Sequence, residues 1–282
     1  MKFLLLFLTA TLTLADMAST ISPSDPRIQI IGRVDRSDPA HVRIAYPGVT
    51  LRFRLTGDLA VLQLTSDLDD TYVAIIVEGS KPQIHRLAKD NNEIILSAAD
   101  LGPGPHTVAV VKRTELWQDT ITFTGWRLGV GATLADPPPL PQRKLLFIGD
   151  SVTCGAGIDN WPACPAETNR PSNGYDAYGM VLGRRLDAQS ELVCYGGRGV
   201  VRDYLGHRNV LNAPQFFDYS IPADDPALQA KWVDDGWTPD AVVISLGTND
   251  WNLQKTDPLT EDEFVGKYLG LVRDVRSHYR HA

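Results

Sequence analysis

The sequence predicts two domains, an N-terminal antiparallel β-sandwich or jelly roll followed by a three-layer α/β domain with a parallel sheet. Three observations lead to this prediction. Short strands without helical periodicity fill residues 26–131, a proline-rich segment occupies residues 132–143, and apolar strands alternate with helices over residues 144–282. The length of 282 residues agrees with two domains, because a domain usually contains roughly 100–200 residues.

The charge balance limits the classes of partner. The chain has 27 Lys and Arg against 34 Asp and Glu, which gives a net charge of −7. Proteins that bind nucleic acid need a basic surplus to neutralise phosphates, so the balance argues against a nucleic-acid partner. Neither a CxxC motif nor a His/Cys cluster is present, so the sequence offers no zinc-site pattern.

Residues 1–18 have the layout of a secretory signal peptide. Lys2 is followed by an apolar run over residues 3–15, and Ala15 and Ala18 are small residues suited to cleavage. An amphipathic first helix or an uncleaved anchor is the alternative. Because no later apolar run is long enough to span a bilayer, we expect a secreted or periplasmic protein that is free of the membrane after cleavage.

The segment from residue 26 to 131 has the alternation of apolar and polar residues that is typical of strands with one buried face. Turn signals such as Pro47-Gly48 and Gly57-Asp58 separate the runs. We expect Trp117 and Trp126 to pack within these strands. The clearest predicted strands are residues 42–46, 50–55, 60–64, 72–77, 106–111 and 121–126.

A domain boundary is predicted within residues 132–143. Four of the five residues 137–141 are proline, and prolines at this density cannot continue a sheet or a helix. They favour a stiff polyproline-like connector.

The second domain contains three continuous apolar runs, at residues 144–148, 191–195 and 241–246. Helical periodicity appears at about residues 175–187 and 261–278. Such alternation predicts a parallel sheet covered by helices, and ligands bind such sheets beyond the carboxyl ends of the strands. All three runs end in a glycine and a polar cluster, so we expect the functional site at this edge.

Three residues at these strand ends suit acyl-transfer chemistry. Ser151 follows the first run on a glycine-rich turn, Gly197 follows the second, and Asn249 follows the third. A hydroxyl can act as a nucleophile, whereas a bare backbone N–H and an uncharged amide can stabilise an oxyanion. Taken singly, each motif also fits a helix cap or a tight turn.

Together, the motifs GDS, Gly-Gly and GTND resemble the SGNH (GDSL) hydrolase superfamily. The strings at residues 147–155, 103–108, 111–115 and 196–199 are further similar to carbohydrate esterase family 2, whose members place a jelly-roll domain before the SGNH domain. The resemblance covers about residues 28–282.

The resemblance implies Ser151 as the nucleophile, with an oxyanion hole formed by its own N–H, the Gly197 N–H and the Asn249 side chain. Gly196 and Gly199 are neighbouring alternatives to Gly197. Asp150 and Asp250 would hold the turns. The implied activity is an acetyl esterase on plant-wall polysaccharides such as xylan or mannan, without a metal or another cofactor.

The sequence departs from the family pattern at the catalytic histidine. Members of the family carry it near the C-terminus, usually with an Asp three residues before it, and no DxxH follows Asn249 here. His278 and His281 lie at a helix end, where a cation interacts favourably with the helix dipole. His207 is an alternative base. We therefore expect that the α/β domain is C-terminally incomplete and that the catalytic histidine is absent from these residues.

Tryptophans and cysteines leave further alternatives open. Trp251 directly follows Asn249, and Trp161 lies in the loop after Ser151. Either ring could stack on a sugar, or it could simply pack. Cys154 and Cys164 could pair in an oxidising compartment, or they could remain free thiols.

The leading hypothesis is a secreted carbohydrate esterase that removes acetyl groups from xylan or mannan through a serine acyl-enzyme. Two alternatives remain at this point. One is a non-catalytic glycan-binding or structural protein, which would release no acetate. The other is an esterase or lipase for different acyl groups, which would need a long apolar groove beside Ser151.

Overall fold

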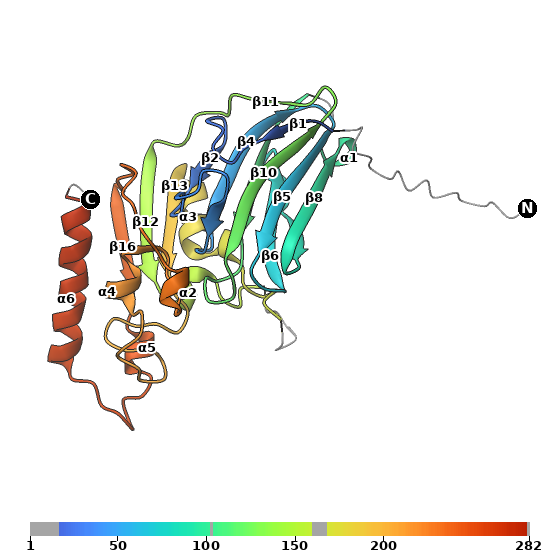
Figure 1. Ribbon diagram of the computed structural model, residues 1–282. Helices are drawn as coiled ribbons and strands as arrows, with labels where there is room; N and C mark the ends of the chain where they lie inside the picture. The colour runs from blue at the N-terminus through green and yellow to red at the C-terminus, as the bar shows by residue number, and fades with distance from the viewer. Residues whose placement is uncertain (1–16, 102–103, 160–167, 281–282) are drawn as a thin grey trace, which may run out of the picture.

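The computed structural model describes residues 17–101, 104–159 and 168–280 (Figure 1). It confirms the predicted architecture, because an antiparallel sandwich precedes an α/β domain with a parallel sheet. In Figure 1 the sandwich lies at the right, the parallel sheet in the middle and the long C-terminal helix at the left. Almost all of the predicted leader lies outside the described residues.

Two antiparallel sheets form the sandwich. The first has the order β1-β10-β5-β8, with β3 also paired to β10. The second has the order β11-β4-β9-β6-β7, with β2 also paired to β4. The strands of the first sheet are β1 (Met17–Ile21), β3 (Val42–Ile44), β5 (Leu59–Ser66), β8 (Asp90–Ser97) and β10 (Ile121–Gly129). Those of the second are β2 (Gln29–Ile31), β4 (Thr50–Thr56), β6 (Thr71–Val77), β7 (Gln83–Leu87), β9 (Pro105–Lys112) and β11 (Thr133–Ala135), and α1 (Ala98–Leu101) follows β8.

The alternating pattern in β4 shows why these residues form a sandwich. Leu51, Phe53 and Leu55 are buried, whereas the arginines between them are less so. Side chains two residues apart share one face of a strand, so the apolar set lies between the sheets. There the ring of Phe53 lies 4.3 Å from that of Trp126, which is fully buried. This confirms the prediction that Trp126 packs within the sandwich.

Two short strands lie outside the sandwich boundaries that we predicted. Strand β1 precedes residue 26 and pairs with β10, and β11 lies within the predicted linker and pairs with β4. Both cover backbone groups at a sheet edge that would otherwise lack partners. Their few residues carry too little alternation to indicate strands in the sequence.

The α/β domain is built on a parallel sheet with the order β13-β12-β16. In its register, Gly149 of β12 lies opposite Cys194 of β13 and Ser245 of β16. The strands are β12 (Arg143–Gly149), β13 (Ala188–Cys194) and β16 (Ala241–Ser245), and a small hairpin consists of β14 (Tyr219–Ile221) and β15 (Ala230–Lys231). The helices are α2 (Ser151–Cys154), α3 (Tyr178–Leu186), α4 (Ala213–Phe216), α5 (Thr248–Trp251) and α6 (Glu261–His278), with short 3₁₀ turns at Gly174–Asp176 and Pro226–Leu228.

Helices pack on this sheet through small and apolar residues. Gly179 of α3 lies directly against the ring of Phe147, where a Cβ atom would come within 2.7 Å of the ring. Helix α6 buries Leu271 and Val275. Among the described residues, no helix is long and apolar enough to cross a membrane.

Arg33, which follows β2 of the sandwich, connects the two domains. Its guanidinium lies 4.5 Å from the ring of Phe217 and 4.0 Å from that of Trp232. It also donates to the Tyr279 hydroxyl at 3.1 Å and to the Phe217 carbonyl. The Glu191 carboxylate lies 3.9 Å from Arg33 Nε, with both side chains buried. Burial raises the pKa of Glu191 to about 7, and Arg33 opposes this rise.

We predict that Arg33→Met lowers the free energy of unfolding by about 3 kcal/mol at pH 8, the usual result of removing one partner of a buried pair. The loss should be smaller at pH 5. Because the folded-state pKa of Glu191 lies above its unfolded value, its contribution to stability is complete at low pH and is lost as the pH rises through about 7. Without Arg33, the charged form of Glu191 is even less favourable, so the variant loses more stability at pH 8 than at pH 5. Urea unfolding at both pH values measures the effect.

Arg86→Met is the matched control, because the ion pair of Arg86 with Asp70 lies at the surface. It should cost at most about 1 kcal/mol. An equal, pH-independent loss in both variants would contradict the role given to Arg33.

Candidate active site

The first predicted motif forms a tight strand-to-helix turn. Ser151 is the first residue of α2 and follows β12 after Asp150. The Asp150 carboxylate caps the helix by accepting from Val152 N at 3.0 Å. A Cβ atom on Gly149 would overlap the side chain of Thr153, so this position requires glycine. The turn therefore holds the Ser151 backbone at the carboxyl end of the sheet.

A buried aspartate connects the third motif to the second. Asp250, in α5 after β16, is fully buried. Its carboxylate accepts from the backbone N–H groups of Val200 at 2.9 Å, Val201 at 2.7 Å and Arg202 at 3.2 Å. Charge-assisted hydrogen bonds to backbone amides are among the stronger ones in proteins. Asp250 thus fixes the segment that follows Gly196, Gly197 and Gly199, the glycines of the second motif, which we call block two.

The three glycines of block two have different surroundings. A Cβ atom on Gly199 would overlap the Asp250 carboxylate, and one on Gly196 would overlap Glu115 Oε2. Gly197 has a φ of +77°, a conformation that favours glycine. Close packing therefore explains two of the glycines, and backbone conformation explains Gly197.

The side chain of Asn249 is held in one orientation. Its Nδ2 donates to the Arg198 carbonyl at 2.8 Å and lies 3.4 Å from Asp150 Oδ2. The second contact is long for a hydrogen bond, so one N–H of the amide can donate to a ligand. Asn249 therefore has the donor that an oxyanion site requires.

The predicted residues Ser151, Gly197 and Asn249 line one pocket of about 460 Å³. The structure thus brings together residues that are spread over about a hundred positions of the sequence. The rest of the lining comes from both domains: Glu115, Trp117, Tyr195, Gly196, Arg198, Asp203, Tyr204 and Asp224. Trp251 is not part of this lining; its ring lies 5.4 Å from that of Phe264. Trp161 lies outside the described residues.

The sandwich contributes Glu115 and Trp117 to the pocket. Both belong to the loop between β9 and β10, and Trp117 is 55% exposed. The prediction that Trp117 packs within the sandwich is therefore wrong, because its position falls in a loop rather than in a strand. Burial raises the pKa of Glu115 to about 7, and the neighbouring Trp117 indole opposes this rise. In the sequence, the only indication of Glu115 was the string at residues 111–115, whose similarity to the family gave it no role in a site.

The described histidines make no hydrogen bond with Ser151. Nδ1 of His207 lies 2.9 Å from Asp203 Oδ2, and its side chain is 61% exposed. It lines an adjoining pocket that shares Arg198, Asp203 and Asp224 with the Ser151 pocket. His278 ends α6 and packs on Phe217 and Trp232.

A disulfide joins Cys154 to Cys194. The open alternatives for Cys154, a pairing with Cys164 or a free thiol, are both wrong. The parallel register explains the observed pairing, because Cys194 lies opposite Gly149 and α2 turns back over this strand end. The Cα atoms lie 5.6 Å apart, within the usual range for a disulfide. Cys164 lies outside the described residues. The bond braces helix α2, which begins at Ser151, against strand β13.

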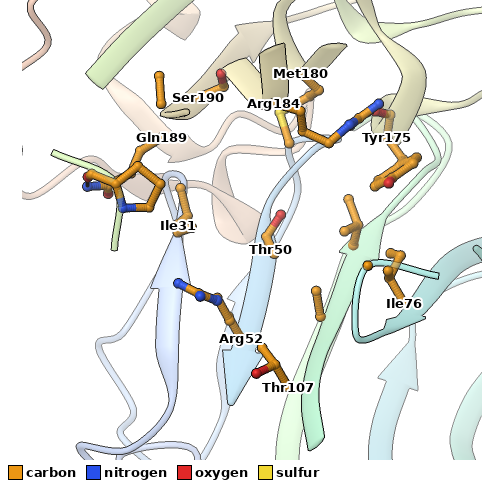
Figure 2. Close-up of a pocket in the computed structure, with 15 residues that line it drawn as sticks. Ile31, Thr50, Arg52, Ile76, Thr107, Tyr175, Met180, Arg184, Gln189 and Ser190 are labelled. Carbon is orange, nitrogen blue, oxygen red and sulfur yellow. Dashed lines mark hydrogen bonds between the residues drawn. The ribbon is translucent and has the colours of Figure 1, made fainter. Parts of the chain in front are cut away.

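Within the described parts of the chain, no group of three or more His, Cys, Asp or Glu side chains is arranged to hold a metal ion. A second pocket, of about 340 Å³, lies between the sandwich and helix α3. Figure 2 shows its wall of Ile31, Ile76 and Met180, with the Arg184 side chain beside the ring of Tyr175. None of the three motifs contributes to the lining of this pocket, whereas all three contribute to the Ser151 pocket.

Comparison with known proteins agrees with this architecture. The family profile described as Carbohydrate esterase 2 N-terminal matches residues 30–138, and the one described as GDSL-like Lipase/Acylhydrolase family matches residues 147–282. The chain is 32% identical over 272 residues to an acetylxylan esterase / glucomannan deacetylase of Cellvibrio japonicus, which covers 96% of this chain and 74% of that protein. It is 30% identical over 265 residues to the cellulase/esterase CelE of Acetivibrio thermocellus, with 94% of this chain and 31% of that protein covered.

Solved structures show the same relationship. A family two carbohydrate esterase from Cellvibrio japonicus superposes with a TM-score of 0.85 at 31% identity, covering 94% of this chain and 76% of that chain. A family two esterase from Clostridium thermocellum in complex with cellohexaose gives a TM-score of 0.79 at 28% identity, covering 90% and 75%. The chain therefore belongs to carbohydrate esterase family 2 and is an SGNH (GDSL) hydrolase that acts on carboxylic esters.

Proposed function

We propose that this protein is a secreted acetyl esterase that deacetylates plant-wall polysaccharides such as xylan and glucomannan through a serine acyl-enzyme. The observation that carries the proposal is the convergence of Ser151, Gly197 and Asn249 in one pocket at the strand ends. A nucleophile beside two uncharged donors is the arrangement that acyl transfer requires. The relative from Cellvibrio japonicus is named for both substrates, and the signal-like layout of residues 1–18 supports secretion.

In the proposed reaction, Ser151 Oγ attacks the carbonyl carbon of the acetyl group. The backbone N–H groups of Ser151 and Gly197 and the Asn249 amide stabilise the negative oxygen of the tetrahedral intermediate. The bond between the carbonyl carbon and the sugar oxygen then breaks, and the sugar leaves with a proton. Water attacks the acetyl-serine in the same way, which releases acetate and restores the hydroxyl.

The proton of Ser151 needs an acceptor during the attack. We assign none of the described residues to this role, because the described histidines form no hydrogen bond with Ser151 and His207 lines the adjoining pocket rather than the Ser151 pocket. The three donors have a separate function, which is to lower the energy of the intermediate.

We predict that Ser151→Ala abolishes acetate release from acetylated xylan and glucomannan by the full-length protein. The substitution removes a single oxygen from a partly exposed side chain, so the thermal unfolding midpoint should remain within a few degrees of the wild-type value. Enzymatic quantification of acetate, with unfolding followed by circular dichroism, measures both effects. Retained turnover in this variant would refute the nucleophile, whereas glycan binding without acetate release by the wild type would favour the non-catalytic alternative.

Asn249→Ala should lower kcat for acetyl-ester hydrolysis by about a hundredfold or more, the usual loss for one oxyanion donor. KM should change little, because the amide acts mainly in the transition state. Steady-state kinetics on a small acetyl ester separate the two constants. Asn249→Asp is a useful companion variant, because the Asp side chain has a similar size but carries a negative charge. It should reduce kcat at least as much as Asn249→Ala does. A wild-type kcat in Asn249→Ala would leave Asn249 as a turn residue only.

A further inference from the structure

The loop between β9 and β10 places the ring of Trp117 in the wall of the Ser151 pocket. Trp117 is 55% exposed, whereas Trp126, in the next strand of the same domain, is completely buried. A large aromatic ring that packing does not bury, beside a nucleophilic serine, is available to a ligand. Nothing in the reaction at Ser151 uses this ring.

A buried ion pair keeps this loop in one conformation. Nζ of Lys112 lies 2.8 Å from Asp119 Oδ1, and both side chains are fully buried. Thr114 adds two bonds, since its carbonyl accepts from Lys112 Nζ at 2.8 Å and its hydroxyl donates to Asp119 Oδ1 at 3.1 Å. Breaking such a pair is strongly unfavourable, so both ends of the loop are fixed.

Further hydrogen bonds hold the tip of the loop, where Trp117 lies. The backbone N–H of Glu115 donates to Gln118 Oε1 at 2.8 Å, and the N–H of Gln118 donates to the Glu115 carbonyl at 3.1 Å. Arg113 extends to the α/β domain and donates to the Ser172 carbonyl at 3.2 Å. The ring is therefore carried by a rigid support, which reduces the entropy cost of binding a ligand against it.

The polar edge of the indole faces inward. Trp117 Nε1 lies 2.9 Å from the position that a Cβ atom of Gly196 would occupy, and the Glu115 carboxylate fills the same space. This contact fixes the N–H edge against the block-two turn. The exposed part of the side chain is thus apolar ring surface directed at the pocket.

We propose that Trp117 is the stacking platform for the sugar ring that carries the acetyl group, so that the sandwich selects carbohydrate as the leaving group. The inference rests on the proposed function. Pyranose rings present flat faces of C–H groups, and aromatic rings bind such apolar faces while the sugar hydroxyls stay hydrated. The acetyl group would then reach Ser151 while its sugar lies on the wall contributed by the other domain.

Binding and kinetics test the proposal separately. Isothermal titration with xylohexaose and mannohexaose should show Kd about tenfold higher for Trp117→Ala, which corresponds to one stacking contact of about 1.4 kcal/mol. KM for acetylated oligosaccharides should rise by a similar factor. For triacetin, an acetyl ester without a ring, kcat/KM should change less than twofold. Trp117→Phe, which keeps an aromatic face, should restore most of the oligosaccharide affinity.

Val130→Ala is the control, because Val130 is 71% exposed and follows the opposite end of β10 in the same domain. It should match the wild type in every assay. Unchanged Kd and KM for oligosaccharides in Trp117→Ala would overturn the proposal. An equal loss of kcat/KM on triacetin would also overturn the proposal. That pattern would indicate that Trp117 supports the turn at Gly196 and Gly197 instead of binding the sugar. Failure of the full-length wild type to release acetate would refute the esterase proposal, while the titrations would still decide the role of Trp117.

Discussion

The parallel pairing of β12 with a strand on each side is the constraint on which the site depends. Gly149, Cys194 and Ser245 lie in one row across the sheet, so the segments that follow the three strands must leave at the same edge. Three short motifs separated by about fifty residues each thereby become neighbours. The disulfide between Cys154 and Cys194 adds a covalent brace across two of these strand ends.

Buried carboxylates turn this proximity into fixed geometry. Asp150 caps the helix that begins at Ser151, and Asp250 binds three consecutive backbone N–H groups after Gly199. Burying a carboxylate without hydrogen-bond partners is costly. Any movement of the surrounding backbone that broke these hydrogen bonds would therefore be unfavourable. Within the sandwich, the buried pair of Lys112 and Asp119 holds the loop that carries Trp117 to the pocket in the same way. The donors that we propose for the oxyanion, if held in this way, need no rearrangement as charge develops.

The sequence was sufficient to predict the two domains and the parallel sheet, and it placed Ser151, Gly197 and Asn249 at the sheet edge where the structure brings them into one pocket. These predictions rest on local signals, namely strand periodicity and short motifs at strand ends. The place of Trp117 in the pocket wall could not be predicted, because it depends on how the sandwich is placed against the α/β domain. The disulfide was missed for a related reason: Cys154 and Cys194 are separated by 40 residues, and only the register of β12 and β13 brings them together.

A crystal structure of the protein after reaction with a small organophosphonate would test the central claim most directly, because the adduct copies the tetrahedral intermediate. We predict that phosphorus is bonded to Ser151 Oγ, with its charged oxygen about 3 Å from the Gly197 N–H and from Asn249 Nδ2. An adduct on another residue would contradict the account. So would an adduct on Ser151 whose oxygen points away from both donors.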